Sequence, residues 1–192
     1  MRIVEASVTM SLDDVRAEAV ALMPFAIHVS ESRVEIDPVH GTLRGPRIQK
    51  HTCGAQLQNW HEGFMREWCE QQVSSDLFPT RCSYLYYDRN SILGLHHDSP
   101  SCTYTAVVNL LGEPPILRIL LDEFDLQIDA LLAASQRGHG QIKQGVEIAL
   151  HSDRPLLFRG FRYPHQLQPF RSQCTLAAFC YATLKPPGDP DE

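Results

Sequence analysis

The sequence predicts an α+β fold that is mainly β, and three observations carry this prediction. From about residue 78 onward, short apolar runs alternate with turn residues, as in short strands. Two earlier segments instead show apolar residues at helical spacing. Finally, potential metal ligands fall on runs far apart in the chain, as expected of facing strands. We therefore expect about eight strands in a double-stranded β-helix, or jelly-roll (cupin-like) barrel, with N-terminal helices packed on the sheet.

Length and composition are those of an ordinary globular protein. The 192 residues are 43% hydrophobic and 21% charged, which is enough for one substantial core. We expect a single domain over 1–184, in which 1–77 form a helical support and 78–184 the jelly-roll core. The polar, proline-rich segment 185–192 is expected to be a disordered tail.

The N-terminal segment predicts one helix followed by irregular structure. Ser11 is the expected N-cap of the helix, and Pro24 ends it. We expect a pair of short strands within 25–36 and a polar, glycine-bearing loop over 40–47. The apolar stripe of the helix consists of Leu12, Val15, Ala19, Leu22 and Met23.

A second, clearer helix is expected between Gly54 and Ser74. Its apolar face should pack on the back of the sheet, and we prefer this interpretation to a cofactor role for the two tryptophans. The residues of this face are Leu57, Trp60, Phe64, Met65, Trp68 and Val73.

The remaining elements are mostly strands. The segment 104–111 is almost continuously apolar, which is typical of a strand buried on both sides. A helix over 124–135 would form a lid, a partner surface or, more simply, a packing element. The other expected strands are 81–87, opened by Pro79, and 116–121, 146–150, 156–158 and 175–183.

Three side chains make up a candidate metal site. His96 and Asp98 share one face of an extended strand, whereas His97 points to the other face. Two ligands cannot close a site, and His165 in a later apolar region is placed to supply the third. Two imidazoles and one carboxylate form the facial triad of non-haem iron(II) oxygenases, which leaves coordination positions open.

Several segments occur in a characteristic order. They are Tyr87, His96–Asp98, the Thr-rich strand 103–110, Ile116–Ile119, Arg154–Phe158 and 164–169. In this order they resemble the Fe(II)/2-oxoglutarate-dependent dioxygenase superfamily, and within it the prolyl-4-hydroxylase-like branch. The resemblance covers roughly 78–184. The first 75 or so residues resemble no family.

The resemblance implies an Fe(II) enzyme with 2-oxoglutarate as cosubstrate that hydroxylates an amino acid or a peptide side chain. Tyr87 matches a family tyrosine that donates a hydrogen bond to the cosubstrate. The resemblance also implies that Leu117 faces the site, which leaves Arg118 outside it.

One position departs from the family pattern. The branch carries a basic residue nine or ten positions after the distal histidine, where this chain has Cys174 and Thr175. Arg171, another basic strand residue, or a different mode of binding would have to hold the cosubstrate. Two other interpretations therefore stay open: an Fe(II) oxidase that does not use 2-oxoglutarate, and a metal-binding jelly roll without catalysis.

Charge and hydropathy exclude other classes of function. The formal net charge is −6 and Lys/Arg residues do not cluster, so we expect no nucleic-acid partner. No apolar run is long enough to span a bilayer, and we expect a cytoplasmic protein without a membrane partner. The expected partner is a small-molecule, amino-acid or peptide substrate.

The remaining cysteines and histidines show no ligand pattern. The six cysteines include no C-x-x-C pair, so buried thiols are expected rather than disulfides or a zinc site. We expect most of the other histidines at the surface or in local hydrogen bonds; they are His28, His40, His51, His61, His139 and His151.

Overall fold

The computed structural model describes residues 3–5, 11–28, 35–36, 43–44, 48–89, 93–120, 145–167 and 172–183. The helices are α1 (Asp13–Leu22), the 3-10 helix η1 (Met23–Phe25), α2 (Ala55–Glu62) and α3 (Phe64–Val73). The strands are β1 (Ile3–Glu5), β2 (Ile27–His28), β3 (Glu35–Ile36), β4 (Leu43–Arg44), β5 (Ile48–Thr52), β6 (Leu77–Tyr87), β7 (Leu93–His96), β8 (Tyr104–Gly112), β9 (Ile116–Ile119), β10 (Val146–Ala149), β11 (Leu156–Phe158), β12 (His165–Leu167) and β13 (Cys174–Thr183).

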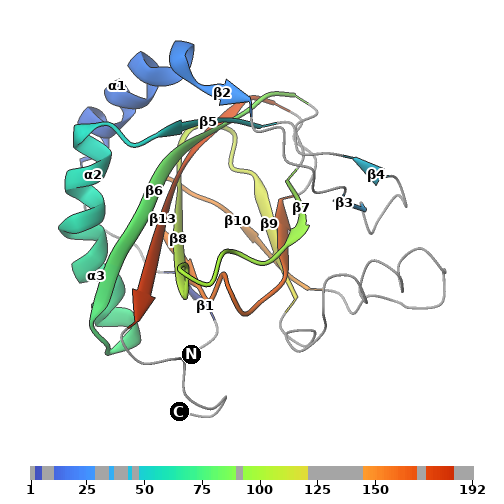
Figure 1. Ribbon diagram of the computed structural model, residues 1–192. Coiled ribbons are helices and arrows are strands. Elements are labelled where there is room, and N and C mark those ends of the chain that lie inside the picture. Colours follow the sequence, from blue (N-terminus) through green and yellow to red (C-terminus); the bar gives the residue numbers. More distant parts are fainter. Residues whose placement is uncertain are drawn as a thin grey trace.

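The strands form two main antiparallel sheets. The large sheet has the order β1-β11-β8-β13-β6-β5-β2, the small sheet has the order β10-β9-β12-β7, and β3 pairs with β4. Figure 1 shows the three α-helices along the outer side of the large sheet and the small sheet on its other side. This arrangement confirms the predicted mainly β jelly roll with helices packed on the sheet.

One hydrophobic core lies between the helices and the large sheet. Alternate residues of β6 face the helices, and the hydroxyl groups of Tyr84 and Tyr86 donate to the carbonyl oxygens of Val15 (3.2 Å) and Ala19 (2.8 Å) in α1. Tyr84 and Tyr86 are therefore packing residues of this core. Each large side chain buried here stabilises the fold by roughly 1.5–3 kcal/mol. The fully buried members include Leu57, Met65, Phe179 and Tyr181.

A second core fills the space between the two sheets. β8 is buried over its first seven residues, as the unbroken apolar pattern predicts, because its two faces line the two cores. The second core contains Tyr87, Val107, Leu117, Ile119, Leu156, Phe158, Leu167, Cys174 and Leu176.

The first helix starts one position later than predicted. Leu12, not Ser11, occupies the N-cap position, and no side chain caps the helix. The Leu12 side chain is buried in the core, so packing rather than capping sets the helix start. Ser11 instead donates to the Asp13 carboxylate at 3.4 Å.

The single helix predicted between residues 54 and 74 is two helices. Gly63, with φ −107° and ψ −106°, separates α2 from α3. The apolar spacing continues across the break because both helices pack on the same sheet, so periodicity alone does not show it. The packing role of the tryptophans is confirmed: Trp68 is buried, and the Trp60 ring lies 6.4 Å from Phe179.

The two short strands expected within 25–36 are present as β2 and β3, and they pair with β5 and β4 rather than with each other. Two further expectations for the N-terminal half were wrong. The predicted loop 40–47 contains the short strand β4. Pro79 lies inside β6 rather than before it, and the pairing with β13 shifts at that point, which lets the sheet accept a residue without an N–H.

The later strands follow the prediction within a few residues, except that β12 was not foreseen. The predicted helix 124–135, the predicted tail 185–192 and Arg171 lie outside the described residues. Of the cysteines, five are buried and Cys53 is half-buried, and none is in a disulfide.

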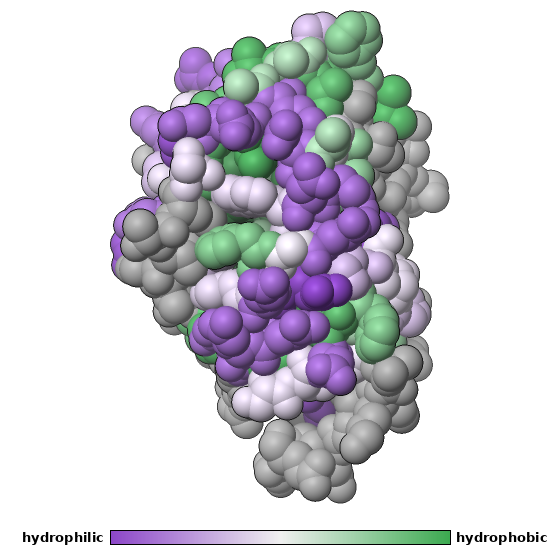
Figure 2. Space-filling model, turned by 90° about the vertical axis from the view of Figure 1, so that its left-hand side faces the viewer, coloured by the Kyte–Doolittle hydropathy of each residue, from purple (hydrophilic) through white to green (hydrophobic). Residues whose placement is uncertain are grey.

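The helix-covered side of the molecule is largely hydrophilic, with hydrophobic surface gathered toward one end (Figure 2). The end of α1, η1 and β2 contribute exposed apolar side chains, namely Val20, Met23, Phe25 and Ile27. No helix among the described residues is long and apolar enough to cross a membrane.

His61 is buried and bonded to a residue far away in the chain, whereas most histidines without a ligand pattern were expected at the surface or in local hydrogen bonds. Its Nε2 lies 3.0 Å from the Cys180 carbonyl oxygen, so Nε2 carries the proton and donates. Burial lowers the pKa of His61 below its ordinary 6.5, although the bond to Cys180 opposes this.

We predict that His61 makes the fold acid-sensitive. Because its pKa is lower in the folded state, the unfolded chain binds more protons as the pH falls through about 6.5. The free energy of unfolding, measured with denaturant, should fall between pH 7.5 and 5.5. It should fall less in His61→Gln, which keeps an N–H donor. Equal pH slopes in the two proteins would contradict this role.

Candidate metal centre

Strand pairing in the small sheet brings the two histidines together. His96 ends β7 and His165 begins β12, and the two residues are directly opposite in the antiparallel register. Side chains of directly opposite residues lie on the same face. The two imidazole rings accordingly have their centroids 4.3 Å apart.

Asp98 reaches the same point from just beyond the strand. β7 ends at His96, so the expectation that Asp98 shares a strand face with His96 was wrong in detail. Two hydrogen bonds hold it instead: its N–H donates to the Gly160 carbonyl oxygen (2.9 Å), and the Thr105 hydroxyl donates to its Oδ2. The large sheet, through Thr105, therefore positions the carboxylate.

Gly160 leaves the space that the carboxylate occupies. A Cβ atom at this position would lie 2.0 Å from Asp98 Oδ2 and 2.3 Å from the Thr105 hydroxyl oxygen. Any side chain here would displace the carboxylate. The glycine is therefore required by close approach and not by backbone conformation.

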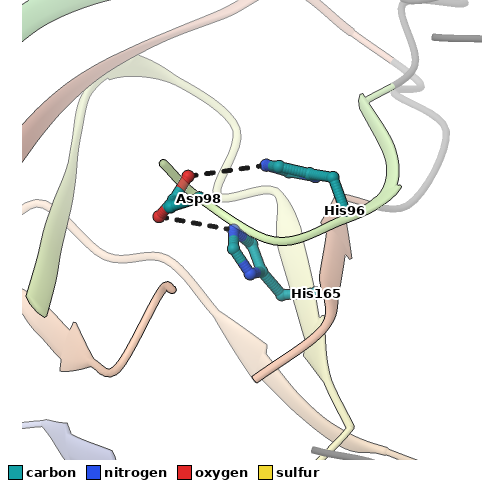
Figure 3. A group of neighbouring side chains, drawn as sticks. All are labelled: His96, Asp98 and His165. Carbon is teal, nitrogen blue, oxygen red and sulfur yellow. Dashed lines mark ion pairs between the residues drawn. The ribbon is translucent and has the colours of Figure 1, made fainter. Parts of the chain in front are cut away.

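The three side chains converge on one point (Figure 3). Asp98 Oδ1 lies 3.7 Å from His96 Nε2, and Asp98 Oδ2 lies 3.8 Å from His165 Nε2. These separations exceed the range of direct hydrogen bonds. One ligand atom from each residue lies within 4.8 Å of the others, a spacing that could hold a metal ion, and among the described residues His97 is not part of this group.

The tautomer of His165 is set by its neighbours. Its Nδ1 lies 2.9 Å from the Tyr163 carbonyl oxygen, which can only accept, so Nδ1–H is the donor. Nε2 is then left with a lone pair that faces Asp98. The rings of Phe158 and His165 also pack in a T-shaped arrangement, with their centroids 4.8 Å apart. This histidine is preorganised as a nitrogen ligand.

The carboxylate is held in its charged form. Burial alone would raise the pKa of Asp98, but His165 and His96 in their protonated forms, the Thr105 hydrogen bond and the charge of Arg81 lower it. The net pKa lies below the ordinary value, so Asp98 is ready to bind a cation.

The structure also places the residues considered for a cosubstrate. Tyr87 and Cys174 are paired across β6 and β13, and both are buried in the core between the sheets. Leu117 lies in the same core, whereas Arg118 lies on the other face and pairs with Glu147, as expected. Arg171 lies outside the described residues.

Sequence reasoning missed the residues that position the carboxylate. Thr105 lies two residues into β8, and strand alternation from the buried Val107 would have placed it on the inner face. Gly160 carried no signal, because its role depends on the approach of Asp98 from another segment.

The comparisons with known proteins show the fold. No protein-family model matches the sequence. No curated protein matches it either.

Solved structures match the chain over almost its full length. A Pseudomonas putida prolyl-4-hydroxylase matches with a TM-score of 0.58 and 15% identity, over 95% of this chain and 92% of that one. HygX from Streptomyces hygroscopicus, solved with nickel and 2-oxoglutarate bound, matches with a TM-score of 0.66 and 13% identity, over 95% and 83%. A Trichoplax adhaerens prolyl hydroxylase, solved with a peptide fragment of hypoxia inducible factor, matches with a TM-score of 0.58 and 13% identity, over 94% and 83%. The chain shares the fold of these Fe(II)/2-oxoglutarate oxygenases.

We predict that Thr105 tunes metal affinity. Thr105→Val removes the hydroxyl donor but keeps the shape, and loss of such an outer partner costs about 10- to 100-fold in affinity. Thr105→Ser keeps the donor and is the matched control. Anaerobic Fe(II) titration should show weaker binding in the valine variant alone. Equal affinities in the three proteins would show that Thr105 does not support Asp98.

Proposed function

We propose that the protein is a non-haem Fe(II)- and 2-oxoglutarate-dependent oxygenase that hydroxylates an amino acid or a peptide side chain. The observation that carries the proposal is the convergence of His96, Asp98 and His165 at the edge of the core between the two sheets. In this proposal these residues are the iron ligands. Residues 78–184 form the catalytic barrel, and 1–77 support it within one domain.

The donor set fits Fe(II). Two imidazoles and one carboxylate form a facial triad, which leaves the remaining positions for exogenous ligands. Iron and the keto acid together supply the oxygen activation. The chain contributes a fixed tautomer at His165, an ionised Asp98, and a surround of buried side chains that limits access of water.

The cosubstrate fits only in part. Tyr87, buried between the sheets, is the proposed hydrogen-bond donor to 2-oxoglutarate. Cys174 faces the same core, and burial raises the pKa of its thiol to about 12, so it is neutral. A thiol carries no positive charge in either of its protonation states, so Cys174 cannot replace the basic residue. The Thr175 side chain is on the opposite face of β13. A carboxylate-binding cation must therefore come from elsewhere, and Arg171 is one candidate.

The substrate class rests on likeness to the neighbours and on charge. Two of them are prolyl hydroxylases, one with a bound peptide, and HygX has also been solved with hygromycin B. An amino acid or a peptide is therefore the class that we favour. The net charge of −6 does not favour nucleic acid as a substrate.

We predict that the protein forms a keto-acid complex on iron. Anaerobic addition of Fe(II) and then 2-oxoglutarate should produce the weak visible charge-transfer band of a chelated keto acid. Exposure of that complex to oxygen should yield succinate. The band should disappear in His96→Ala, which removes a ligand, and persist in Cys174→Ala, because the thiol is not required.

The same titration distinguishes the dioxygenase from the oxidase and from the metal-binding protein without catalysis. Iron binding without a band at any concentration of keto acid would contradict the dioxygenase proposal. Oxygen consumption without succinate would then indicate an oxidase, and no oxygen consumption would indicate a metal-binding protein without catalysis.

A further inference from the structure

A row of inward-facing side chains connects β6 to the carboxylate of the metal centre. Arg81 on β6 is opposite Cys180 on β13, and Cys180 is opposite Thr105 on β8. Thr105 donates to Asp98 at the end of the row. Strand register therefore places Arg81 on the same face of the large sheet as Thr105, which holds the Asp98 carboxylate.

Arg81 is within reach of the metal centre. Neighbouring strands are about 4.8 Å apart, so the Arg81 backbone lies two strand spacings, roughly 10 Å, from that of Thr105. Its guanidinium donates to the sulfur of Cys180 on β13, the strand between β6 and β8. The Arg81 side chain therefore extends from β6 toward Thr105. Its positive charge also acts on Asp98.

Arg81 is accessible as well as near. The residue is exposed, whereas Cys180 and Thr105, which follow it across the sheet, are buried. Five other described arginines are engaged elsewhere: Arg118 pairs with Glu147, Arg66 with Glu70 and Arg154 with Asp153, while Arg159 lies over the Tyr104 ring and Arg16 donates to the Leu110 carbonyl oxygen. A planar guanidinium at the rim of the site suits a carboxylate.

Among the side chains that the structure describes along β13 and its neighbours β6 and β8, the opposite end of the inner face offers no buried cation. Along β13 the inner positions run from Cys180 through Ala178 and Leu176 to Cys174, and Cys174 is opposite Tyr87. The buried side chains described around this end are apolar, phenolic, thiol or, at Asn109, an uncharged amide. A carboxylate buried there would find no charged partner among them, which is unfavourable in a protein interior.

We propose that Arg81 binds a carboxylate of a ligand held at the metal. The carboxylate belongs either to the far end of the keto acid or to the primary substrate. This inference rests on the proposed function, because both ligands require the iron centre. In this proposal Arg81 is the residue that makes the site prefer a ligand with a free carboxylate over one without it.

The first arm of the test compares two keto acids. 2-Oxobutyrate chelates iron as 2-oxoglutarate does but lacks the far carboxylate. If Arg81 binds the cosubstrate, the charge-transfer band of the wild type should saturate at much lower 2-oxoglutarate than 2-oxobutyrate. Arg81→Gln should reduce that preference roughly 10- to 100-fold, in line with a charged hydrogen-bonded pair. Arg118→Gln, on the other face of its strand, is the control and should leave the preference unchanged.

The second arm tests the primary substrate. The Fe(II)·2-oxoglutarate complex is titrated with each free L-amino acid and with its amide. If Arg81 binds a substrate carboxylate, at least one acid should shift the band where its amide does not, and Arg81→Gln should abolish the shift. The inference is overturned if Arg81→Gln leaves the keto-acid preference intact and no carboxylate-dependent shift is lost.

Failure of the proposed function is distinguishable from failure of this inference. If no keto acid gives a band in the wild type, the proposed function fails. Arg81 is then tested in the Co(II)-loaded protein, whose visible spectrum reports ligands on the metal. Succinate should perturb that spectrum at lower concentration in the wild type than in Arg81→Gln, and equal titrations would overturn the inference.

Discussion

The pairing of β7 with β12 is the constraint on which the candidate metal centre depends. It places His96 opposite His165, so that two residues 69 positions apart present imidazoles on one face. A shift of register by one residue would turn one ring to the other side of the sheet. β12 also pairs with β9, where His165 is opposite Ile119, so the small sheet holds β12 from both edges. The geometry of the nitrogen ligands thus follows from backbone hydrogen bonds.

The large sheet and the loop after β11 position the third candidate ligand, Asp98, and surround the site. Asp98 lies beyond β7 and is fixed by Gly160 and Thr105, which belong to the loop after β11 and to β8. The metal centre therefore forms only when the two sheets face each other correctly. The apolar core between the sheets maintains this spacing, and the helices bury the outer face of the large sheet. Fold stability and the geometry of the site are in this way coupled.

The sequence predicted what local pattern determines and missed what tertiary contact determines. Alternation and apolar runs gave the mainly β class and most strands, and the order of short segments indicated the likeness that the solved structures bear out. It did not give the break at Gly63, because the apolar face continues across it. The burial of His61 and the support of Asp98 by Gly160 arise between segments far apart in the chain. No spacing rule contains that information.

The same distinction applies to the cosubstrate. Counting from His165 identifies Cys174 as the departure from the family pattern, and the structure shows why it matters, since the thiol is buried and uncharged. The row from Arg81 to Asp98 could not be counted from the sequence. It depends on how β6, β13 and β8 are aligned.

The central claim is that His96, Asp98 and His165 bind a single Fe(II). Its most direct test compares substitutions of two histidines that are adjacent in the sequence, His96 and His97. Anaerobic equilibrium titration should give one Fe(II) per chain in the wild type. His96→Ala should weaken binding by more than about 100-fold, as removal of a ligand requires, since outer partners alone account for 10- to 100-fold. His97→Ala should bind as the wild type does, because His97 is outside the ligand group. Equal losses in the two variants, or wild-type affinity in His96→Ala, would contradict the account.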